Sequence, residues 1–286
     1  MKSLIGILNL SEFDAKKAAQ QWSVRMLSLL RSRPNYPFIL DEKRLNNNIE
    51  RQQTRWNESV PFHHIVIDDF LLDKHIKFLS DNFPAAEHPV WLDWKTRSKF
   101  QWGKQGPGNS ERFSLLDPGF LLALHEFNSW KFLRYLECLT GIEALLPDPY
   151  FTGGGIHQIL KGGILDIHTD FNDYERLKIY RRLNVLLYLT KDWREDYGGS
   201  LQLWNNAPKL GGRCVKSIAP IFNRCVVFET DKNSFHGHPE QWNAPEGLYR
   251  RSIALYYYTA TKRSDRQYDG LTDFQGYVAK ELPAAR

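Results

Sequence analysis

The sequence feature that most constrains the fold is a run of short strand patterns over residues 153–259, separated by turns and interrupted by no helical pattern. Apolar residues recur at every second position in GGGIHQILKGGILDIHTD, RRLNVLLYLTKDW, GGSLQLWN, RCVKSIAP, NRCVVFET and YRRSIALYYYT. Gly, Asn, Asp and Pro separate these segments. Strands joined by turns, without crossover helices, form antiparallel sandwiches or barrels. We therefore predict an antiparallel β-domain in this half of the chain.

Helical patterns come before the strands. Residues 12–33 carry apolar side chains at a helical period, with Ser11 as a suitable N-cap and Pro34 as a stop. Residues 34–60 are polar, and we expect a connecting segment there, either a surface linker or an irregular arm that binds a partner. After Pro61, HHIVIDDF alternates as a strand does, and LLDKHIKFLSDNFP follows as a short helix.

A second helical pattern spans residues 117–141. Asp117 is a suitable N-cap, Pro118 takes the first helical position, and Gly141 can end the helix. The stretch before it, VWLDWKTRSKFQWGKQGPGNSERF, mixes aromatic, basic, Gly and Pro residues, which indicates a long loop. That loop either packs its rings against the body or forms a lid over the substrate. Its candidates for substrate contact are Trp91, Trp94, Trp102 and Arg112.

These patterns divide the chain into regions and predict an α+β protein. The regions are a helical N-terminal extension (1–60), a mainly helical support (61–150), a β-rich core (151–262) and a C-terminal tail (263–286). Aromatic residues are abundant, and many are expected to pack within the strands. The clearest examples are Trp193, Trp204 and the run Tyr256, Tyr257 and Tyr258, whereas we expect His63 and His64 at the surface.

Charge and cysteine content narrow the class of protein. The 38 Lys and Arg residues against 33 Asp and Glu give a formal charge of +5 without a clustered basic run, which indicates ordinary solubility rather than a nucleic-acid face. Three cysteines without C-x-x-C spacing fit a reducing cytoplasm. No apolar run approaches the roughly 18 residues of a membrane helix, and no signal-peptide cleavage pattern follows the start. We expect a cytoplasmic protein without nucleic-acid or membrane partners.

Side chains suited to metal chemistry gather in the β-half. In a strand, His168 and Asp170 point to the same face, so an imidazole and a carboxylate can share one metal ion. His236 comes later and can join them from a neighbouring strand of a folded-back barrel. Two imidazoles and one carboxylate make the facial triad of non-haem Fe(II) oxygenases, which leaves metal positions open for substrate and O₂. His238 is an alternative ligand in place of His236.

A basic residue on the following strand would have a binding role if the co-substrate is a dicarboxylate such as 2-oxoglutarate. One end of that molecule chelates iron, and the far carboxylate needs a charged partner inside the barrel. An arginine offers it a bidentate fork. Strand alternation lets only one of Arg250 and Arg251 point inward. We favour Arg250, because Ser252 then lies on the same face and can donate a second hydrogen bond.

Together these residues resemble a known family. From about Gly153 to Thr259 the chain resembles Fe(II)/2-oxoglutarate-dependent oxygenases of the prolyl-4-hydroxylase-like branch. The matching stretches are GGILDIHTDFN, RRLNVLLYLTKDW, YGGSLQLWN, FNRCVVFETDKNSFHGHPE and YRRSIALYYYT. The resemblance implies a double-stranded β-helix, a jelly-roll or cupin-like core, with supporting N-terminal helices. It also implies Fe(II), 2-oxoglutarate and O₂ as cofactor and co-substrates, with ascorbate as a stimulant.

The same resemblance implies roles for particular residues. It implies that iron is bound by His168, Asp170 and His236. It implies that 2-oxoglutarate is bound by Arg250, Ser252, Tyr188 and Asn184. The co-substrate pocket would be lined by Asn184, Leu186, Leu201 and Phe228. Two further residues, His157 and Arg182, either reach a ligand or belong to a surrounding hydrogen-bond network.

The implied reaction is hydroxylation of an unactivated C–H bond, with release of succinate and CO₂. Related halogenases carry a small residue in place of Asp170, so this carboxylate favours hydroxylation, although desaturation and ring closure stay open. The expected substrate is a free or carrier-bound amino acid, a peptidyl residue such as proline, or another small metabolite. Two other classes remain: a metal-binding sensor without turnover, and a Zn- or Mn-dependent cupin-type enzyme, in which Arg250 and Ser252 would have no role.

Overall fold

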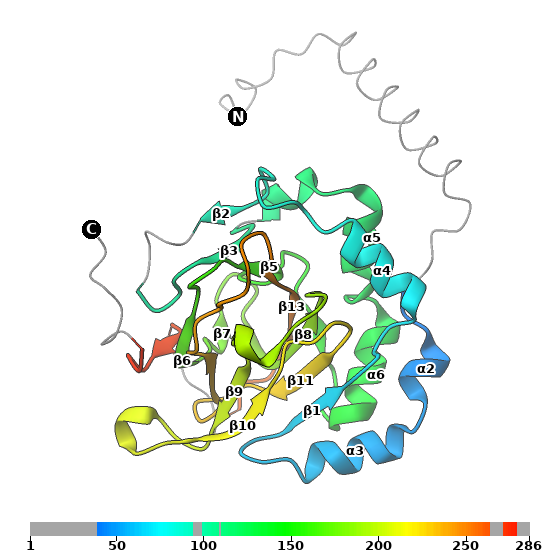
Figure 1. Ribbon diagram of the computed structural model, residues 1–286. Coiled ribbons are helices and arrows are strands. Elements are labelled where there is room, and N and C mark those ends of the chain that lie inside the picture. The colour runs from blue at the N-terminus through cyan, green and yellow to red at the C-terminus, as the bar shows by residue number, and fades with distance from the viewer. Residues whose placement is uncertain (1–38, 94–98, 109, 264–270, 279–286) are drawn as a thin grey trace, which may run out of the picture. The chain divides into compact units, whose positions relative to one another are not determined.

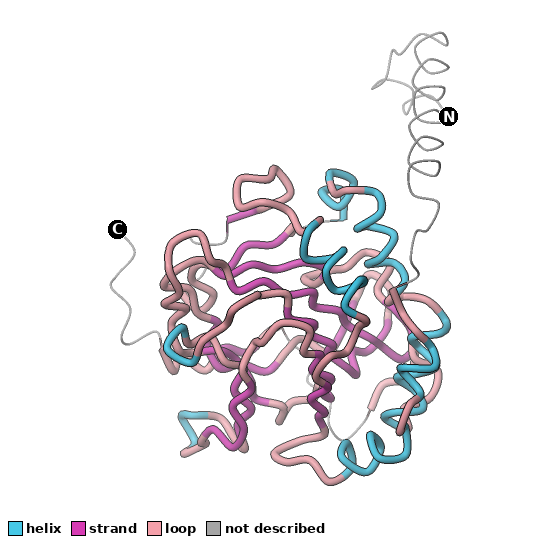
Figure 2. Tube along the Cα trace, turned by 45° about the vertical axis from the view of Figure 1, so that its right-hand side comes forward, coloured by secondary structure: helices cyan, strands magenta, loops and turns pink. Residues whose placement is uncertain are grey.

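Residues 39–93, 99–108, 110–263 and 271–278 are described by the computed structural model of the chain, and all belong to one of its two units, Ile39–Arg286. The helix expected over residues 12–33 lies outside the described residues. Two antiparallel sheets form the body of this unit, and its helices gather on one side of them (Figures 1 and 2). None of the described helices is long and apolar enough to cross a membrane.

The larger sheet has nine strands and contains most of the expected strand segments. Its main path runs β1-β11-β8-β13-β5-β3-β2, while β4 pairs with β13 and β7 pairs with β8. The long strands β8 and β13 pair at its centre. The strands are β1 (His64–Ile67), β2 (Leu92–Asp93), β3 (Lys104–Gly106), β4 (Leu146–Pro147), β5 (Gly155–Ile159), β7 (Asp173–Tyr174), β8 (Ile179–Tyr188), β11 (Cys225–Glu229) and β13 (Arg250–Thr259).

The smaller sheet has five strands in the order β10-β9-β12-β6-β14. They are β6 (Leu165–Thr169), β9 (Leu201–Trp204), β10 (Cys214–Ile218), β12 (Phe235–His238) and β14 (Asp273–Phe274). From β5 to β13 the chain passes repeatedly from one sheet to the other, so neighbours in sequence often lie in opposite sheets. This winding closes two sheets around a common interior, as a jelly-roll does.

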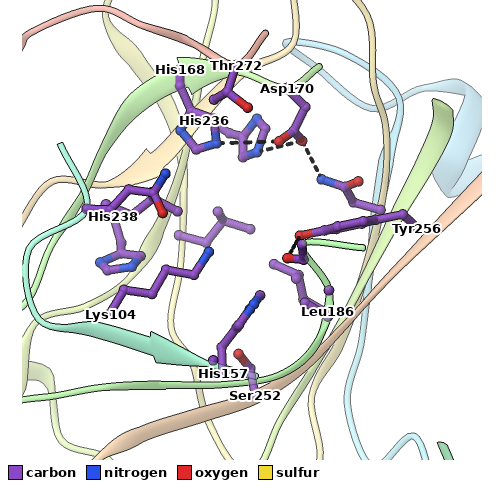
Figure 3. A pocket seen from close by; sticks show the side chains of 18 of the residues that line it. Lys104, His157, His168, Asp170, Leu186, His236, His238, Ser252, Tyr256 and Thr272 are labelled. Atoms are coloured by element: carbon purple, nitrogen blue, oxygen red, sulfur yellow. Dashed lines mark hydrogen bonds and ion pairs between the residues drawn. The ribbon is translucent and has the colours of Figure 1, made fainter. Parts of the chain in front are cut away.

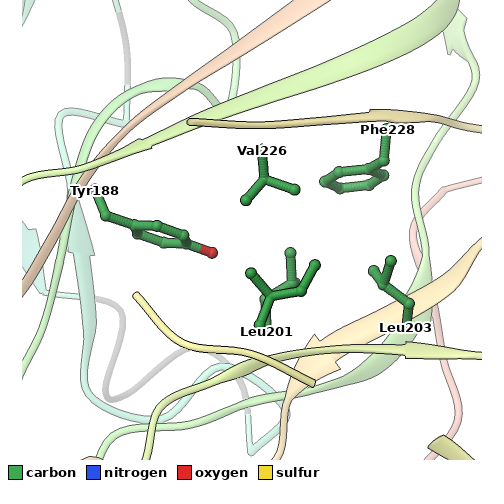
Figure 4. Packing of buried hydrophobic residues seen from close by; sticks show 6 residues of the cluster. Tyr188, Leu201, Leu203, Val226 and Phe228 are labelled. Carbon is green, nitrogen blue, oxygen red and sulfur yellow. The ribbon is translucent and has the colours of Figure 1, made fainter. Parts of the chain in front are cut away.

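An apolar cluster joins the two sheets on the inside (Figure 4). Val226 and Phe228 come from the larger sheet, while Leu201 and Leu203 come from the smaller one, and all are buried. Tyr188 lies at one end of the cluster and is fully buried. Burying a side chain of this size stabilises the folded state by about 1.5–3 kcal/mol. The cluster therefore fixes the separation of the sheets beside the pocket described below.

The polar segment 34–60 contains two helices, so the expectation of an irregular connection is wrong for its described part. They are α2 (Glu42–Asn46) and α3 (Ile49–Asn57). The Asp41 side chain caps α2 by accepting from the amide of Arg44, and Trp56 of α3 is 2% exposed. Contacts with α6 (Trp130–Thr140) hold α3: Tyr135 donates to Gln52 at 2.7 Å. Tertiary contacts, rather than an apolar stripe, stabilise these helices.

The single helix expected over residues 117–141 is two helices, α5 (Pro118–Glu126) and α6. The predicted ends are confirmed: Asp117 caps α5, and Gly141 takes a left-handed conformation after α6. Ser129 between them has extended backbone angles, and the Asn128 side chain donates to the carbonyl of Asp148. The break lets the two helices follow different directions over the larger sheet. The other helix on this side is α4 (Asp73–Asp81), as expected.

The stretch expected as a long loop before α5 contributes two strands to the larger sheet. β2 pairs with β3, and β3 pairs with β5, so that Lys104 lies opposite Ile159. The strands are too short, and too rich in Gly and polar residues, for an alternating pattern to reveal them. His64 is also misplaced by the sequence analysis, because it lies in β1 and is 7% exposed rather than at the surface.

Candidate active site

A pocket opens between the two sheets, and strands of both sheets line it. Figure 3 shows two groups of side chains facing each other across it. We call His168, Asp170 and His236 the metal end, because their potential ligand atoms all lie within 4.8 Å of one another. We call the facing group of basic and polar side chains the cationic end. It consists of Lys104, His157, Arg250 and Ser252.

Antiparallel pairing of β6 and β12 builds the metal end. His168 and His236 are direct partners in this pairing, and their ring centroids lie 4.4 Å apart. Asp170 follows β6, with one carboxylate oxygen 3.6 Å from Nε2 of His168 and the other 3.3 Å from Nε2 of His236. The register between β6 and β12 therefore brings His236, which is distant in sequence, next to His168 and Asp170.

Backbone carbonyls orient both imidazoles of the metal end. Nδ1 of His168 donates to the carbonyl of Asp166 at 2.7 Å, and Nδ1 of His236 donates to the carbonyl of Ser234 at 2.8 Å. Since the proton is then on Nδ1, each Nε2 presents its lone pair toward Asp170. Burial, together with the neighbouring His236, lowers the pKa of His168, which favours this neutral form. Two imidazoles and a carboxylate fit Fe(II).

Arg181 is part of this site and was missed by the sequence analysis. Its guanidinium lies 3.1 Å from an oxygen of Asp170, donates to Oδ1 of Asn184 and stacks on the ring of Tyr256. Burial alone would raise the pKa of Asp170, but the positive charge of Arg181 holds it well below its usual value. Asp170 is therefore a carboxylate that is ready to bind a cation.

Arg182, which shares the even-numbered face of the expected strand with Asn184 and Tyr188, does not line the pocket. Its side chain lies 3.7 Å from Glu229 instead. A bulge causes the difference, because Tyr257 pairs with Leu183 whereas the next residue of β13 pairs with Arg181. The additional residue in β8 shifts the alternation, and Arg181 faces the pocket in place of Arg182.

Contacts between strands hold Arg250 at the cationic end. The side chain is buried, Nε donates to the carbonyl of Gly199 at 2.6 Å, and Nη2 lies 3.4 Å from the hydroxyl of Tyr188. Gly199 has φ +71°, and a Cβ there would lie 2.8 Å from the ring of Trp242 and 3.0 Å from Arg250. A glycine is therefore needed where the backbone passes so close to the guanidinium.

Some of the other expected residues line the pocket, and others lie outside it. Asn184 lines the pocket and donates to Asp170 at 2.8 Å. Tyr188 lies behind Arg250 and does not itself line the pocket, and Arg251 faces away, over the ring of Phe83. Also in the lining are His157, Leu186, Leu201, Phe228, His238, Ser252 and Tyr256, the last of which was expected to serve only in packing.

Those expected lid residues that the structure describes do not line this pocket. Trp91 packs against Phe83, and Arg112 donates to the carbonyl of Pro89, while Trp94 lies outside the described residues. The same stretch instead brings Lys104 of β3 into the lining. Trp102 is not among the lining residues either. No pattern in the sequence distinguished Lys104 from the other basic residues of the stretch.

Sequence comparison identifies the family of the β-domain. Residues 154–258 match the family model of the 2OG-Fe(II) oxygenase superfamily. A prolyl 3-hydroxylase of Mus musculus is 37% identical over 79 residues, which are 27% of this chain and 14% of that protein. Its Xenopus laevis counterpart is 35% identical over 82 residues, 27% of this chain and 15% of that protein. The matched part thus spans about one seventh of these relatives.

Comparison with solved structures supports the fold. A prolyl hydroxylase from Trichoplax adhaerens, solved with a peptide of hypoxia inducible factor, superposes with a TM-score of 0.52 at 18% identity, covering 77% of this chain and 94% of that one. HygX from Streptomyces hygroscopicus, with nickel, 2-oxoglutarate and hygromycin B, gives 0.50 at 12% identity, covering 78% and 96%. The predicted double-stranded β-helix is confirmed, and residues 154–258 match the predicted superfamily.

Proposed function

Because residues 154–258 belong to the 2OG-Fe(II) oxygenase superfamily, we propose that this protein is an Fe(II)- and 2-oxoglutarate-dependent hydroxylase. It would hydroxylate an unactivated C–H bond of an amino acid, a peptidyl residue or a small metabolite, releasing succinate and CO₂. The observation that carries the proposal is that one pocket holds a two-His, one-carboxylate group at one end and a buried arginine at the other. These ends suit the two functional groups of 2-oxoglutarate.

The residues divide the work between the two ends of the pocket. His168, Asp170 and His236 would hold Fe(II), which together with 2-oxoglutarate supplies the capacity to activate O₂. Arg250 would bind the far carboxylate of 2-oxoglutarate, and Ser252 would donate to the same group. Arg181 keeps Asp170 ionised and fixed in direction. Leu186, Leu201 and Phe228 provide an apolar wall that limits access of water.

The sequence relatives indicate which class of substrate should be tested first. The two relatives are prolyl 3-hydroxylases, and one structural neighbour binds a peptide, so a prolyl or related peptidyl residue is the first substrate to try. The proposal includes residues 151–262 as the catalytic core. It also includes a cytoplasmic location, because Cys138, Cys214 and Cys225 are free thiols.

Release of ¹⁴CO₂ from 1-labelled 2-oxoglutarate tests the reaction. Purified full-length protein is incubated in air with Fe(II) and ascorbate, with and without peptide or metabolite mixtures. We expect succinate and CO₂ in equal amounts from the wild type and neither from Asp170→Ala. Metal and 2-oxoglutarate binding without any turnover would contradict the proposal and would favour a sensor.

A further inference from the structure

Lys104 brings a second cation to the pocket, next to the one expected to bind 2-oxoglutarate. In the larger sheet β5 lies between β3 and β13, and Ile159 of β5 pairs with Lys104 on one side and with Arg250 on the other. Residues in one row across a sheet project to the same face. Both side chains therefore enter the pocket from neighbouring positions, and Figure 3 shows Lys104 reaching toward its centre.

Among the described residues, the ammonium group of Lys104 has no counter-ion, and its Nζ forms no hydrogen bond or ion pair. Burial lowers the pKa of Lys104 to about 8, and Asp170 opposes part of that fall. The amine is thus mostly protonated at neutral pH. An unpaired cation in a desolvated place is costly, which favours an anionic ligand beside it.

The neighbours of Lys104 do not supply that anion. His157 and His238 line the same pocket. Burial lowers the pKa of His157 well below its usual value, with Lys104 and Arg250 adding to the effect. Nδ1 of His238 is buried without a hydrogen-bond partner. The ring of His157 is therefore neutral, and both rings offer polar contacts rather than a negative charge.

The net charge of the side chains that line the pocket indicates the charge of the ligand that would balance it. The residues that line the pocket include one carboxylate, Asp170, and three cations, Lys104, Arg181 and Arg250, a surplus of two positive charges. Fe(II) and the 2-oxoglutarate dianion cancel each other, so the surplus persists when both are bound. Arg181 is already paired with Asp170, and Arg250 faces the co-substrate under the proposed function. Lys104 is therefore the one of these three cations that has no assigned anion.

We propose that Lys104 is a substrate-binding residue and that it selects a substrate carrying a carboxylate. This inference rests on the proposed function and narrows its substrate class. Lys104 lies outside residues 154–258, the part that matches the superfamily, so the superfamily match does not assign it a role. Binding determinants supplied from beside a shared core are a common way for one fold to serve different substrates.

Matched pairs of ligands test the inference without knowledge of the natural substrate. The probes are N-acetylated amino acids and their N-acetyl amides, which differ only in the carboxylate. Affinities are measured by ligand-observed NMR on full-length protein loaded with Zn(II) and saturating 2-oxoglutarate. The variants are Lys104→Met, Lys104→Arg and, as a control that removes a surface charge, Lys161→Met. Thermal unfolding of each variant checks that it is folded.

We expect at least one acid to bind the wild type about tenfold more tightly than its amide. The preference should fall below about twofold in Lys104→Met and persist in Lys104→Arg and Lys161→Met. Binding of 2-oxoglutarate should change little in all of them. Equal binding of acids and amides, or no binding by any acid, would overturn the inference. So would a loss of 2-oxoglutarate affinity in Lys104→Met that equals the loss for the acid.

The same samples separate this inference from the proposed function. If 2-oxoglutarate fails to bind the metal-loaded wild type, the proposed function fails and the inference fails with it. If 2-oxoglutarate binds but the acids show no preference, only the inference fails.

Discussion

The metal end and the cationic end of the pocket are held in place in different ways. At the metal end, each imidazole is oriented by a carbonyl two residues earlier in its own segment, that of Asp166 or Ser234. At the cationic end, Arg250 is oriented by the carbonyl of Gly199 and by Tyr188, both distant in sequence. The imidazoles of the metal end are therefore each oriented within their own segment, whereas Arg250 at the cationic end depends on how several strands meet.

The two ends also differ in charge balance. Asp170 is paired with Arg181, so its charge is neutralised before any ligand arrives. Arg250 and Lys104 have no carboxylate beside them among the residues that line the pocket. At the metal end, a bound metal ion would therefore add to or replace the contact of Asp170 with Arg181. At the cationic end, the positive charges are balanced only when a ligand binds. Four substitutions separate these behaviours.

The largest effect is expected when a ligand of the metal end is removed. His236→Ala should weaken metal binding by more than about a hundredfold, beyond the loss usual for a residue that only supports a ligand. His238→Ala is the matched control, because it lines the same pocket outside the three-residue group and should retain the metal. Anaerobic equilibrium dialysis with Fe(II) measures both. Loss of metal in His238→Ala and retention in His236→Ala would reverse the assignment.

Arg181→Met should lower the stability of the metal-free protein by about 3 kcal/mol, because it leaves Asp170 as an uncompensated buried charge. Added metal should recover much of this loss, since the ion replaces the positive charge that was removed. Arg182→Met is the control, because that side chain lies beside Glu229 instead. Urea denaturation with and without Zn(II) gives the values. An equal loss in both states would show that Arg181 acts through packing alone.

Arg250→Met should raise the Kd of 2-oxoglutarate about a hundredfold, or about 2.7 kcal/mol, and leave metal affinity unchanged. The control is Arg251→Met on the same strand, whose side chain faces Phe83 and should have little effect. Calorimetric titration of metal-loaded protein compares them. A similar loss in both variants would mean that the cationic end does not discriminate between the two arginines.

The smallest effect concerns pH. Burial, and then the charge of Lys104, holds the pKa of His157 well below 6.5 in the folded protein. The unfolded chain therefore takes up this proton first as pH falls, so stability is present above about pH 6.5 and is lost below it. The loss can reach about 1.4 kcal/mol per pH unit. His157→Gln should flatten the dependence between pH 6.5 and 5, measured by urea denaturation of metal-free protein, whereas an unchanged slope would contradict it.

The contrast between the ends explains what could be predicted from the sequence. His168 and Asp170 are two residues apart in one strand, so simple alternation puts them on one face. Arg250 and Ser252 follow the same rule, and the structure puts both in the pocket lining. The strand segments from Gly155 onward were predictable for the same reason, because their patterns are local.

The residues that were missed depend on features that a single sequence does not display. The bulge in β8 exchanged Arg181 for Arg182, and nothing in RRLNV signals an additional residue. β3 has only three residues and is a strand because β5 offers it an edge, so Lys104 could not be located in advance. Similarly, α3 exists through its contacts with α6 rather than through its own pattern.

The central claim is that one molecule of 2-oxoglutarate binds to an iron ion at the metal end and to Arg250 at the cationic end. Anaerobic titration of Fe(II)-loaded protein with 2-oxoglutarate tests this directly, because chelation by the keto-acid produces a visible charge-transfer band. We predict a saturable band in the wild type, its loss in His168→Ala, and a shift of its midpoint to about a hundredfold higher 2-oxoglutarate in Arg250→Met. No band in iron-loaded wild-type protein, or an unchanged midpoint in Arg250→Met, would contradict the account.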